Sequence, residues 1–265
     1  MRRLRVFDTI DIQRRFGGTA RLFGAVAAQA IQSAHVVVVG LGGVGSWAAE
    51  ALARAGVGAL TLIDFDHLAE SNINRQLHAL DATLGQSKVE AMAQRIAAFA
   101  PHCRVRVVDA FVTPDNWPGL LDAQAVDAVL DACDQISAKR TLAAWALAQR
   151  VRLIVCGAAG GKCDAAGVRC DDLLAVTHDP LLAKLRYSLR KSGALARDAR
   201  RAGVMCVFSR EPVRAPVDAA CAHDASLNCH GYGSVVTVTA TFGLVAAGWV
   251  LQQLAQSARA AQTLC

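Results

Sequence analysis

The sequence predicts an α/β protein built on a doubly wound, mostly parallel sheet, and three observations point to this class. Strand-like runs rich in Val, Leu and Ile alternate with helix-length segments between residues 35 and 157. A hydrophobic content of 54% is enough to bury a substantial core. Aromatic residues make up only 5% of the chain, which suits helices packed on a parallel sheet better than a β-sandwich or a barrel.

The period of the apolar residues predicts each element in turn. Short apolar runs predict strands at residues 35–40, 59–64, 104–111, 126–131 and 153–157. Helical periodicity predicts helices at residues 45–55, 87–98 and 138–149. Because strands alternate with helices, we expect parallel pairing through right-handed crossovers.

Beyond residue 160 the periodicity weakens. Segment 158–167, AAGGKCDAAG, is predicted to be rich in turns. Residues 204–211 predict a further strand, and the apolar tract that begins at Val235 predicts a long final helix.

That apolar tract raises the question of a membrane. No Asp, Glu, Lys or Arg occurs in residues 225–258, and residues 235–251 approach the length of about 20 residues that a membrane helix needs. Polar and small residues within the tract favour a helix buried against protein: Thr237, Thr239, Thr241, Gly243 and Gly248. We therefore expect a core helix, while membrane association through it stays open.

The charge distribution is basic, with 28 Lys and Arg against 22 Asp and Glu and a net charge of +6. This balance is compatible with a polyanionic partner but does not require one. The basic residues are densest in segment 182–203, which holds Lys184, Arg186, Arg190, Lys191, Arg197, Arg200 and Arg201. A solvated helix surface and a surface that faces nucleic acid are both compatible with this segment.

The cysteines indicate a reducing compartment. Nine cysteines occur without a CxxC pair or the Cys/His spacing of a zinc site. The start of the chain, MRRLRVFDTI, lacks the apolar run of a secretory leader. We therefore expect reduced thiols and a cytoplasmic location.

A glycine-rich loop follows the first predicted strand and opens the next helix. Its glycines let the backbone approach phosphate oxygens, and the helix N-terminus supplies free N–H groups. Asp64 ends the second strand, where a carboxylate accepts hydrogen bonds from ribose hydroxyls. An adenine nucleotide is predicted to bind Asp64 and the glycines Gly40, Gly42, Gly43 and Gly45.

Polar and basic residues follow the second strand. Three amides and a guanidinium come first: Asn72, Asn74, Gln76 and Arg75. Lys88 then begins the next predicted helix. Cations at this place neutralise a triphosphate and a departing pyrophosphate, which hydride transfer does not require. The pattern therefore favours ATP over NAD, and an NAD-dependent oxidoreductase or NAD sensor is the weaker alternative.

Two carboxylates, Asp131 and Asp134, lie at the end of the fourth strand, at the carboxyl edge where open α/β sheets bind ligands. One carboxylate there can hold the magnesium ion that accompanies ATP, and Asp134 is the candidate. The alternative interpretation makes Asp134 the N-cap of the following helix. The two roles can coexist.

The glycine loop, Asp64, the NINRQ sequence, Lys88 and Asp134, in this order, resemble the ATP-dependent adenylating family that includes ubiquitin-activating enzymes and the bacterial ThiF and MoeB proteins. Within that family, the chain is most similar to the branch of dehydratases that act on threonylcarbamoyladenosine in tRNA. The similar segments run nearly from end to end: RFGGTARLFG (15–24), GLGGVGSWAAEALAR (40–54), NRQLHAL (74–80), FVTPDN (111–116), DPLLAKLR (179–186), CVFSRE (206–211) and TVTATFG (237–243).

The resemblance implies an ATP-dependent enzyme of the ligase class that forms an acyl-adenylate on the substrate and closes it to a cyclic hydantoin, with release of AMP and pyrophosphate. The alternative is adenylation of the C-terminus of a ubiquitin-like sulfur-carrier protein. The resemblance also implies that four residues contact phosphates or metal: Asn72, Arg75, Lys88 and Asp134. One adenylation domain is expected over residues 1–265, with a helical arm at 1–34, a nucleotide-binding core at 35–160 and a substrate side at 161–265.

The partners implied by the resemblance are tRNA and a second copy of the chain. In the homodimer an N-terminal arginine reaches the neighbouring site; Arg21 is the first candidate and Arg15 the second, against the reading of each as an exposed or capping arginine. The implied cofactors are ATP and Mg²⁺, and a monovalent cation stays open. No structural zinc is expected, because the two CxxC pairs of ThiF and MoeB relatives are missing.

Three cysteines are candidates for a further role: Cys163, Cys206 and Cys229. The resemblance suggests a link to a cysteine-desulfurase sulfur relay at Cys229. The alternative interpretation is a small buried hydrophobic residue or an unreactive thiol in each case. The cyclisation itself requires no cysteine, because its nucleophile lies within the substrate.

Overall fold

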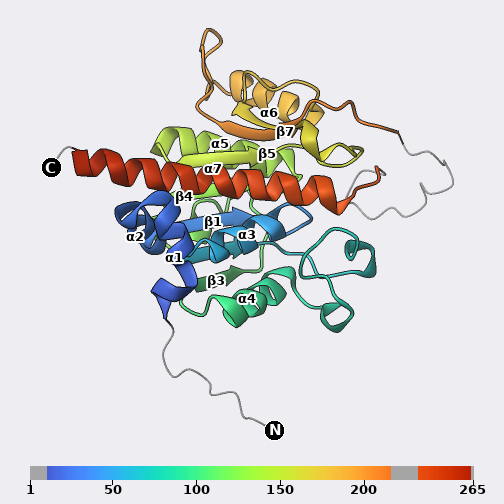
Figure 1. Cartoon of the computed structure of the whole chain (residues 1–265). Helices are drawn as coiled ribbons and strands as arrows, with labels where there is room; N and C mark the ends of the chain where they lie inside the picture. Colours follow the sequence, from blue (N-terminus) through green and yellow to red (C-terminus); the bar gives the residue numbers. More distant parts are fainter. Residues whose placement is uncertain (1–10, 216–231, 264–265) are drawn as a thin grey trace.

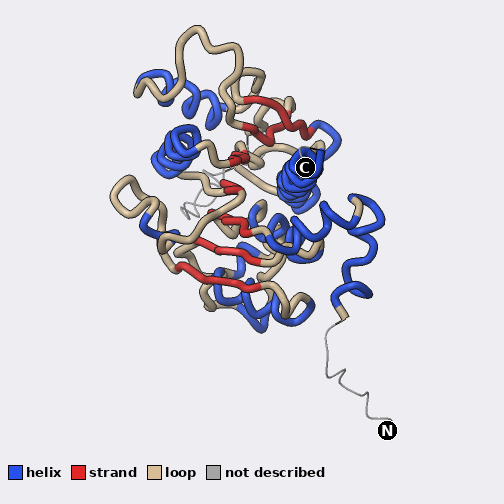
Figure 2. Tube along the Cα trace, turned by 90° about the vertical axis from the view of Figure 1, so that its left-hand side faces the viewer, coloured by secondary structure: helices blue, strands red, loops and turns tan. Residues whose placement is uncertain are grey.

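The fold is that of an α/β protein with a single seven-stranded sheet between two layers of helices (Figures 1 and 2). The structure is a computed structural model that describes residues 11–215 and 232–263. The strands are β1 His35–Val39, β2 Ala59–Ile63, β3 Arg104–Val108, β4 Ala128–Asp131, β5 Arg152–Cys156, β6 Val168–Asp172 and β7 Met205–Ser209. The helices are α1 Ile12–Phe23, α2 Ala25–Ser33, α3 Gly45–Arg54, α4 Lys88–Phe99, α5 Ile136–Gln149, α6 Pro180–Lys191 and α7 Val236–Thr263.

The strand order is β3-β2-β1-β4-β5-β7-β6, and every pair is parallel except β6 with β7. The predicted doubly wound, mostly parallel class is therefore confirmed. The chain builds outward from β1 in one direction through β2 and β3, and then continues from β4 in the other direction. The switch point lies between β1 and β4, where ligands bind in sheets of this kind.

One strand was missed by the sequence analysis. β6 lies at the edge of the sheet, and its residues alternate between buried and more exposed positions, with Arg169 and Asp171 on the exposed side. Charged side chains are typical of edge strands, which pair on one side only. Because of these charged residues and the glycines of segment 158–167 before them, residues 168–172 lack the apolar pattern from which a strand is predicted.

The core has two halves, one on each face of the sheet. Val36 and Val38 of β1 contribute to the half covered by α3, α4 and α7, while Val37 and Val39 contribute to the half covered by α5 and α6. A strand buried on both faces has apolar residues at every position, which explains the run of four valines in β1.

Helix α7 crosses one face of the sheet beside α2 and α3 (Figure 1). Gly243 makes the crossing close, because an added Cβ would overlap the carbonyl oxygen of Val44 and lie 3.0 Å from the amide nitrogen of Ala48. Residues 236–260 are long and apolar enough to cross a membrane by length and composition, yet 56% of the most apolar window is buried inside the protein. This burial favours the predicted core helix.

Candidate functional site

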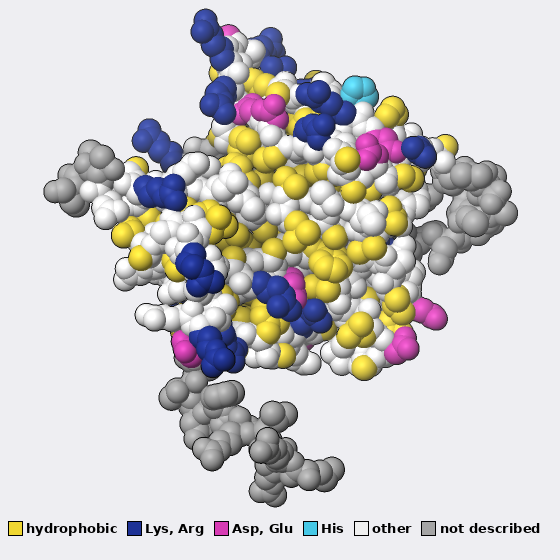
Figure 3. Space-filling model, viewed as in Figure 1, with side chains coloured by type: hydrophobic (Ala, Val, Ile, Leu, Met, Phe, Trp, Pro, Cys, Tyr) yellow, Lys and Arg dark blue, Asp and Glu magenta, His cyan; other side chains and the backbone are white. Residues whose placement is uncertain are grey.

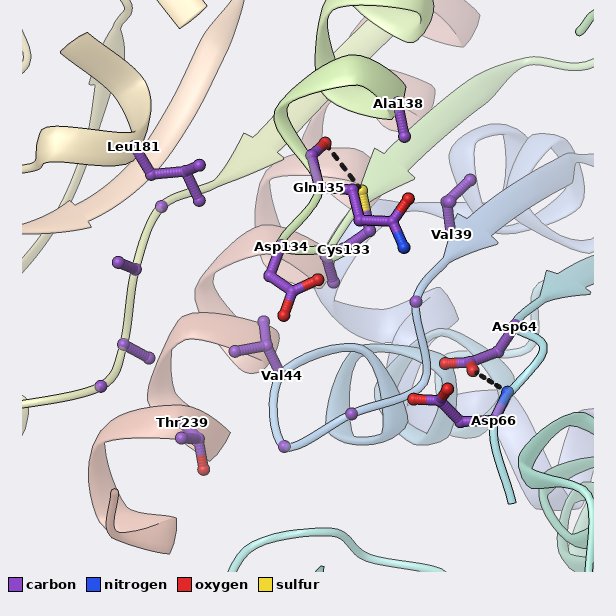
Figure 4. Close-up of a pocket in the computed structure, with 18 of the residues that line it drawn as sticks. Val39, Val44, Asp64, Asp66, Cys133, Asp134, Gln135, Ala138, Leu181 and Thr239 are labelled. Atoms are coloured by element: carbon purple, nitrogen blue, oxygen red, sulfur yellow. Dashed lines mark hydrogen bonds between the residues drawn. The ribbon is translucent and has the colours of Figure 1, made fainter. Parts of the chain in front are cut away.

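A pocket of about 640 Å³ lies at the carboxyl ends of β1 and β4, at the switch point of the sheet. Its walls come from the glycine loop, the segments that follow β2, β3, β4 and β5, the start of α6 and the start of α7. The carboxylates of Asp64 and Asp134 enter it from the segments that follow β2 and β4 (Figure 4). The predicted strand at 104–111 ends at Val108, and the residues that follow it, Ala110 to Val112, line the pocket instead.

The glycines of the loop have separate roles. Gly40 has φ +84°, and a Cβ there would lie 2.8 Å from the amide nitrogen of Cys133. A Cβ at Gly45 would overlap the carbonyl oxygen of Gly40, so these two glycines allow the loop to close against β4 and α3. Gly42 lines the pocket, and nothing lies within 4 Å of the position of its Cβ. Gly42 therefore leaves room for a ligand rather than for protein.

Asp64 links the glycine loop to the turn after β2. Its Oδ2 accepts a hydrogen bond from the amide of Leu41 at 2.5 Å, and its Oδ1 accepts one from the amide of Asp66 at 2.9 Å. Burial raises the pKa of Asp64, while Lys88 and the two amide hydrogen bonds oppose that rise. Asp64, the residue predicted to bind ribose, thus lies in the pocket wall. Each of its carboxylate oxygens keeps a further lone pair that can accept a hydrogen bond from a hydroxyl group.

Lys88 lies at the start of α4 and is only 2% exposed. Its Nζ donates to Asp66 Oδ2 at 2.7 Å, and both residues line the pocket. Asp66 is a candidate site residue that the sequence analysis missed. Its position two residues beyond Asp64, at the same edge of the sheet, was the available signal.

Arg75 also lines the pocket. Its Nη1 donates to the carbonyl oxygen of Ser71 at 2.7 Å and to Asn74 Oδ1 at 2.9 Å, so the local turn holds the guanidinium. The side chain of Arg75 passes over Gly43, where a Cβ would lie 3.0 Å from Arg75 Cγ. Asn74 in turn donates to the carbonyl oxygen of Ser234 at 3.0 Å, which connects this turn to the segment before α7.

The structure places the remaining predicted amides differently from one another. Gln76 lines the pocket at 4% exposure, and its Oε1 has no hydrogen-bond partner among the described residues. Asn72 is 1% exposed, accepts a hydrogen bond from the amide of Ala69 at 3.1 Å, and is not among the residues that line the pocket. Asn72 therefore shapes the turn that carries Arg75.

Asp134 is exposed to the pocket and points into the space between the glycine loop and Leu181 (Figure 4). The N-cap of α5 is Gln135, so the interpretation of Asp134 as the cap was wrong. The helix begins one residue later than that interpretation requires, which leaves the carboxylate of Asp134 directed at the pocket. Within the described residues, no group of three or more His, Cys, Asp or Glu side chains could hold a metal ion.

A buried ion pair lies behind this loop. Lys139 Nζ is 3.2 Å from Asp131 Oδ1, and neither side chain is exposed. Asp131 Oδ1 also accepts hydrogen bonds from the amide and the thiol of Cys133, at 3.1 Å and 2.9 Å. Burial alone would lower the pKa of Lys139, but Asp131, Cys133 and Cys156 together outweigh this effect and raise it. The pair holds the loop between β4 and α5, and the sequence analysis did not predict Lys139.

The candidate arginines of the N-terminal arm lie outside this pocket. Arg21 is exposed on α1, and Arg15 Nη1 donates to the carbonyl oxygen of Phe99 at 2.8 Å. Among the candidate cysteines, Cys163 is exposed, Cys206 is buried with a raised pKa caused mainly by that burial, and Cys229 lies outside the described residues. Cys206 thus has the character of a core residue.

The basic segment begins at the pocket and leads away from it. Lys184 on α6 lines the pocket. Figure 3 shows Lys and Arg side chains gathered at the top of the view, over α6 and the loop that follows it. A cationic surface therefore adjoins the pocket on the α6 side.

Comparisons with known proteins agree with this geometry. The ThiF family model matches residues 17–264. The tRNA threonylcarbamoyladenosine dehydratase of Escherichia coli K12 is 44% identical over 258 residues, which cover 93% of this chain and 96% of that protein. The crystal structure of E. coli TcdA, the same dehydratase, in complex with ATP has a TM-score of 0.85 at 43% identity and covers 96% of this chain and 99% of that one. The corresponding complex with AMP has a TM-score of 0.85 at 42% identity, with coverages of 95% and 100%.

Proposed function

The chain belongs to the ThiF family, and on this premise we propose that it uses ATP to dehydrate threonylcarbamoyladenosine in tRNA to its cyclic hydantoin form. The observation that carries the proposal is one pocket in which the open Gly42, the cations Arg75 and Lys88, and the carboxylates of Asp64 and Asp134 converge. Proteins that are similar over nearly the whole chain are named tRNA threonylcarbamoyladenosine dehydratases, and crystal structures of one of them contain ATP or AMP.

The chemistry solves the problem that a carboxylate is a poor electrophile. The substrate carboxylate attacks the α-phosphorus of ATP, the bond to the β-phosphate oxygen breaks, and pyrophosphate leaves. The acyl-adenylate now carries AMP as a good leaving group. A nitrogen of the same side chain attacks the activated carbonyl, gives up its proton and expels AMP, so the nucleoside loses one water in total. An intramolecular nucleophile gains its advantage from proximity.

The proposed roles of the residues follow from their positions. Gly42 and the amides at the start of α3 receive phosphate oxygens, and Asp64 receives the ribose hydroxyls. Arg75 and Lys88 stabilise the charge that develops as pyrophosphate leaves. Ligand binding would compete with Asp66 for the ammonium group of Lys88.

Magnesium is the proposed metal, and the residues present fit it. Mg²⁺ is commonly bound by one or two carboxylates together with substrate phosphates, so a site without three protein ligands is expected for it. Asp134 points into the pocket and would hold the ion. When bound, the ion would neutralise part of the charge on the phosphates.

A homodimer is the proposed assembly. Exposed apolar side chains lie on α1, α2 and α7: Leu22 at 76%, Val26 at 41% and Leu244 at 50%. Apolar surface of this kind is suited to contact with another copy. Since Arg21 lies outside the pocket of its own chain, we propose that it acts in the partner's pocket.

The proposed tRNA surface is the basic segment of α6 and its following loop, because it is continuous with the pocket through Lys184. Lys and Arg side chains bind the RNA backbone without reading its sequence.

A sulfur-relay partner would need an accessible thiol, and Cys163 is exposed in the described part of the chain.

The decisive experiment is mass spectrometry of modified tRNA after incubation with the protein, ATP and Mg²⁺. The expected result is a nucleoside that has lost one water, together with AMP and pyrophosphate in equal amounts. ADP as the sole nucleotide product would overturn the proposal. Adenylation of a sulfur-carrier protein is the alternative, which the comparisons do not favour; a carrier-adenylate detected by mass, without any change in the tRNA, would support it.

A further inference from the structure

The segment predicted to be rich in turns contains a buried lysine. Lys162 is 1% exposed, although it lies among glycines in the loop between β5 and β6. A lysine is almost never fully buried without specific partners. The contacts of this side chain therefore require an explanation.

Three backbone carbonyl groups surround the ammonium group. Lys162 Nζ donates to Glu211 at 2.8 Å, to Ser209 at 3.0 Å and, more weakly, to His178 at 3.4 Å. These carbonyls belong to the end of β7, the segment after it and the turn before α6. The three N–H donors of a lysine thus join three segments that are distant in the sequence.

Glu211 completes the connection from the other side. Its Oε2 accepts hydrogen bonds from the amides of Cys163 and Asp164, both at 2.8 Å. The amide of Asp164 is the main reason why the pKa of Glu211 lies below its ordinary value. Lys162 binds the backbone of Glu211, and Glu211 binds the backbone next to Lys162, so each residue fixes the other.

Gly161 continues the same connection into the pocket wall. Its amide donates to the carbonyl oxygen of Gly233 at 2.8 Å, and its carbonyl oxygen accepts from the amide of Arg214 at 2.8 Å. Gly161 has φ +71°, and a Cβ there would lie 2.7 Å from Val213 Cγ1. Next to these contacts, three residues line the pocket: Gly160, Val213 and Tyr232.

This wall lies on the β5 and α6 side of the pocket, whereas Asp64 and Lys88 lie on the β2 side. Figure 4 shows Leu181 of α6 and Asp64 on opposite sides of the pocket. If the nucleotide occupies the β2 side, the carboxylate of the modified nucleoside, which attacks the α-phosphorus, has to approach from the β5 side. Tyr232 is 40% exposed there and offers an aromatic face on which a base can stack.

We propose that Lys162 is a positioning residue for the second substrate, because it fixes the wall formed by Gly160, Val213 and Tyr232 against which the modified nucleoside binds. The inference rests on the proposed function. It assigns Lys162 no contact with ATP, and the hydrogen bonds of Lys162 do not reach Asp64, Asp66 or Lys88.

The test compares Lys162→Met, which cannot donate hydrogen bonds, with Lys162→Gln, whose amide can donate two. We expect Lys162→Met to raise the KM for modified tRNA by about tenfold or more, with Lys162→Gln between it and the wild type. The Kd for ATP should stay within about twofold in both variants, since the three hydrogen bonds of Lys162 lie on the other side of the pocket. If Lys162→Met lowered kcat and Tm but left the ratio of the KM for modified tRNA to the KM for ATP unchanged, the role of Lys162 would be purely structural. That result would overturn the inference.

A second measurement does not depend on turnover. Hydrogen exchange of the Gly161 and Arg214 amides should become faster in Lys162→Met, while the amides of Leu41 and Asp66 stay protected. If Lys162→Met does not fold, Glu211→Gln takes its place, with the exposed Glu90→Gln on α4 as the matched control. Unchanged exchange at Gly161 and Arg214 would overturn the inference. A wild-type protein inactive on modified tRNA would overturn the proposed function, and the exchange data would still decide whether Lys162 holds the wall.

Discussion

Lys88 Nζ and Asp66 Oδ2 form an ion pair of 2.7 Å in the wall of the pocket, although the side chain of Lys88 is only 3% exposed and that of Asp66 is 36% exposed. The lysine is therefore desolvated and paired before any ligand binds. A cation prepared in this way would need little reorganisation to exchange the carboxylate for a phosphate oxygen, as the proposed function requires.

The first prediction concerns this ion pair. Lys88→Met should lower kcat for AMP formation by about 10²–10³-fold, the range typical for loss of one preorganised group that stabilises the transition state. Arg140→Met, at an exposed position of α5 outside the pocket, is the control for the loss of one positive charge. Release of pyrophosphate measures the effect, and a Lys88→Met protein that turns over at the wild-type rate would show that Lys88 has no part in the reaction.

The second prediction separates two glycines of the loop. Gly42→Ala should keep the stability of the wild type, since no protein atom lies within 4 Å of the added Cβ, but should weaken ATP binding by about tenfold or more. Gly40→Ala should instead destabilise the fold by about 1–3 kcal/mol, because its φ of +84° and the amide nitrogen of Cys133 both oppose a side chain. Urea unfolding and calorimetric titration with ATP distinguish the two effects. Equal losses of stability in both variants would contradict the assignment.

The third prediction concerns the buried pair of Asp131 and Lys139. Lys139→Met leaves the Asp131 carboxylate buried without a counter-charge and should cost about 3–5 kcal/mol of stability. Replacing Asp131 by Asn in the same protein removes the second charge and should restore a large part of that loss. The free energy of unfolding in urea measures both steps. A double variant as unstable as the sum of its single variants would show that the two residues act independently.

The fourth prediction is a dependence of stability on pH. Burial, followed by the charges of Lys88 and Arg95, lowers the pKa of His78 to about 4 from an ordinary value of 6.5. The unfolded chain therefore binds a proton at His78 between these pH values while the folded chain does not, so stability falls as the pH drops from 6.5 to 4 and is unaffected by His78 above that range. The contribution should be at most about 3 kcal/mol.

The measurement for this prediction is the free energy of unfolding at a series of pH values. His78→Gln should flatten the dependence between pH 4 and 6.5, whereas His67→Gln, at an exposed position, should leave it unchanged. A wild-type profile that is flat across this range would mean that His78 is protonated in the folded protein.

The sequence was most informative where function restricts the backbone. Within the pocket wall lie Gly40, Gly42, Gly43, Asp64, Arg75, Lys88 and Asp134. The glycines, Asp64 and Asp134 follow parallel strands, whose carboxyl ends meet at one edge of the sheet. Their individual roles in catalysis stay predictions. The strand pattern was equally informative for β1, whose four valines are buried on both faces.

Contacts between distant segments could not be predicted in the same way. Neither the ion pair of Lys139 with Asp131 nor the contacts of Lys162 have a local pattern, since each joins residues brought together only by the folded chain. β6 was hidden by the polarity of an edge strand. Asn72 does not line the pocket, because its side chain accepts a hydrogen bond within its own turn. The period of apolar residues does not predict such a contact.

The close crossing of α7 over Val44, which Gly243 permits, has a consequence for the order in which the protein is made. The residue that precedes α3 is braced by a helix that lies about two hundred residues later in the chain. On the ribosome, the glycine loop is synthesised before α7 and stays unsupported on this side until α7 has emerged. The proposed binding site for the nucleotide is thus completed only after about two hundred further residues have been translated.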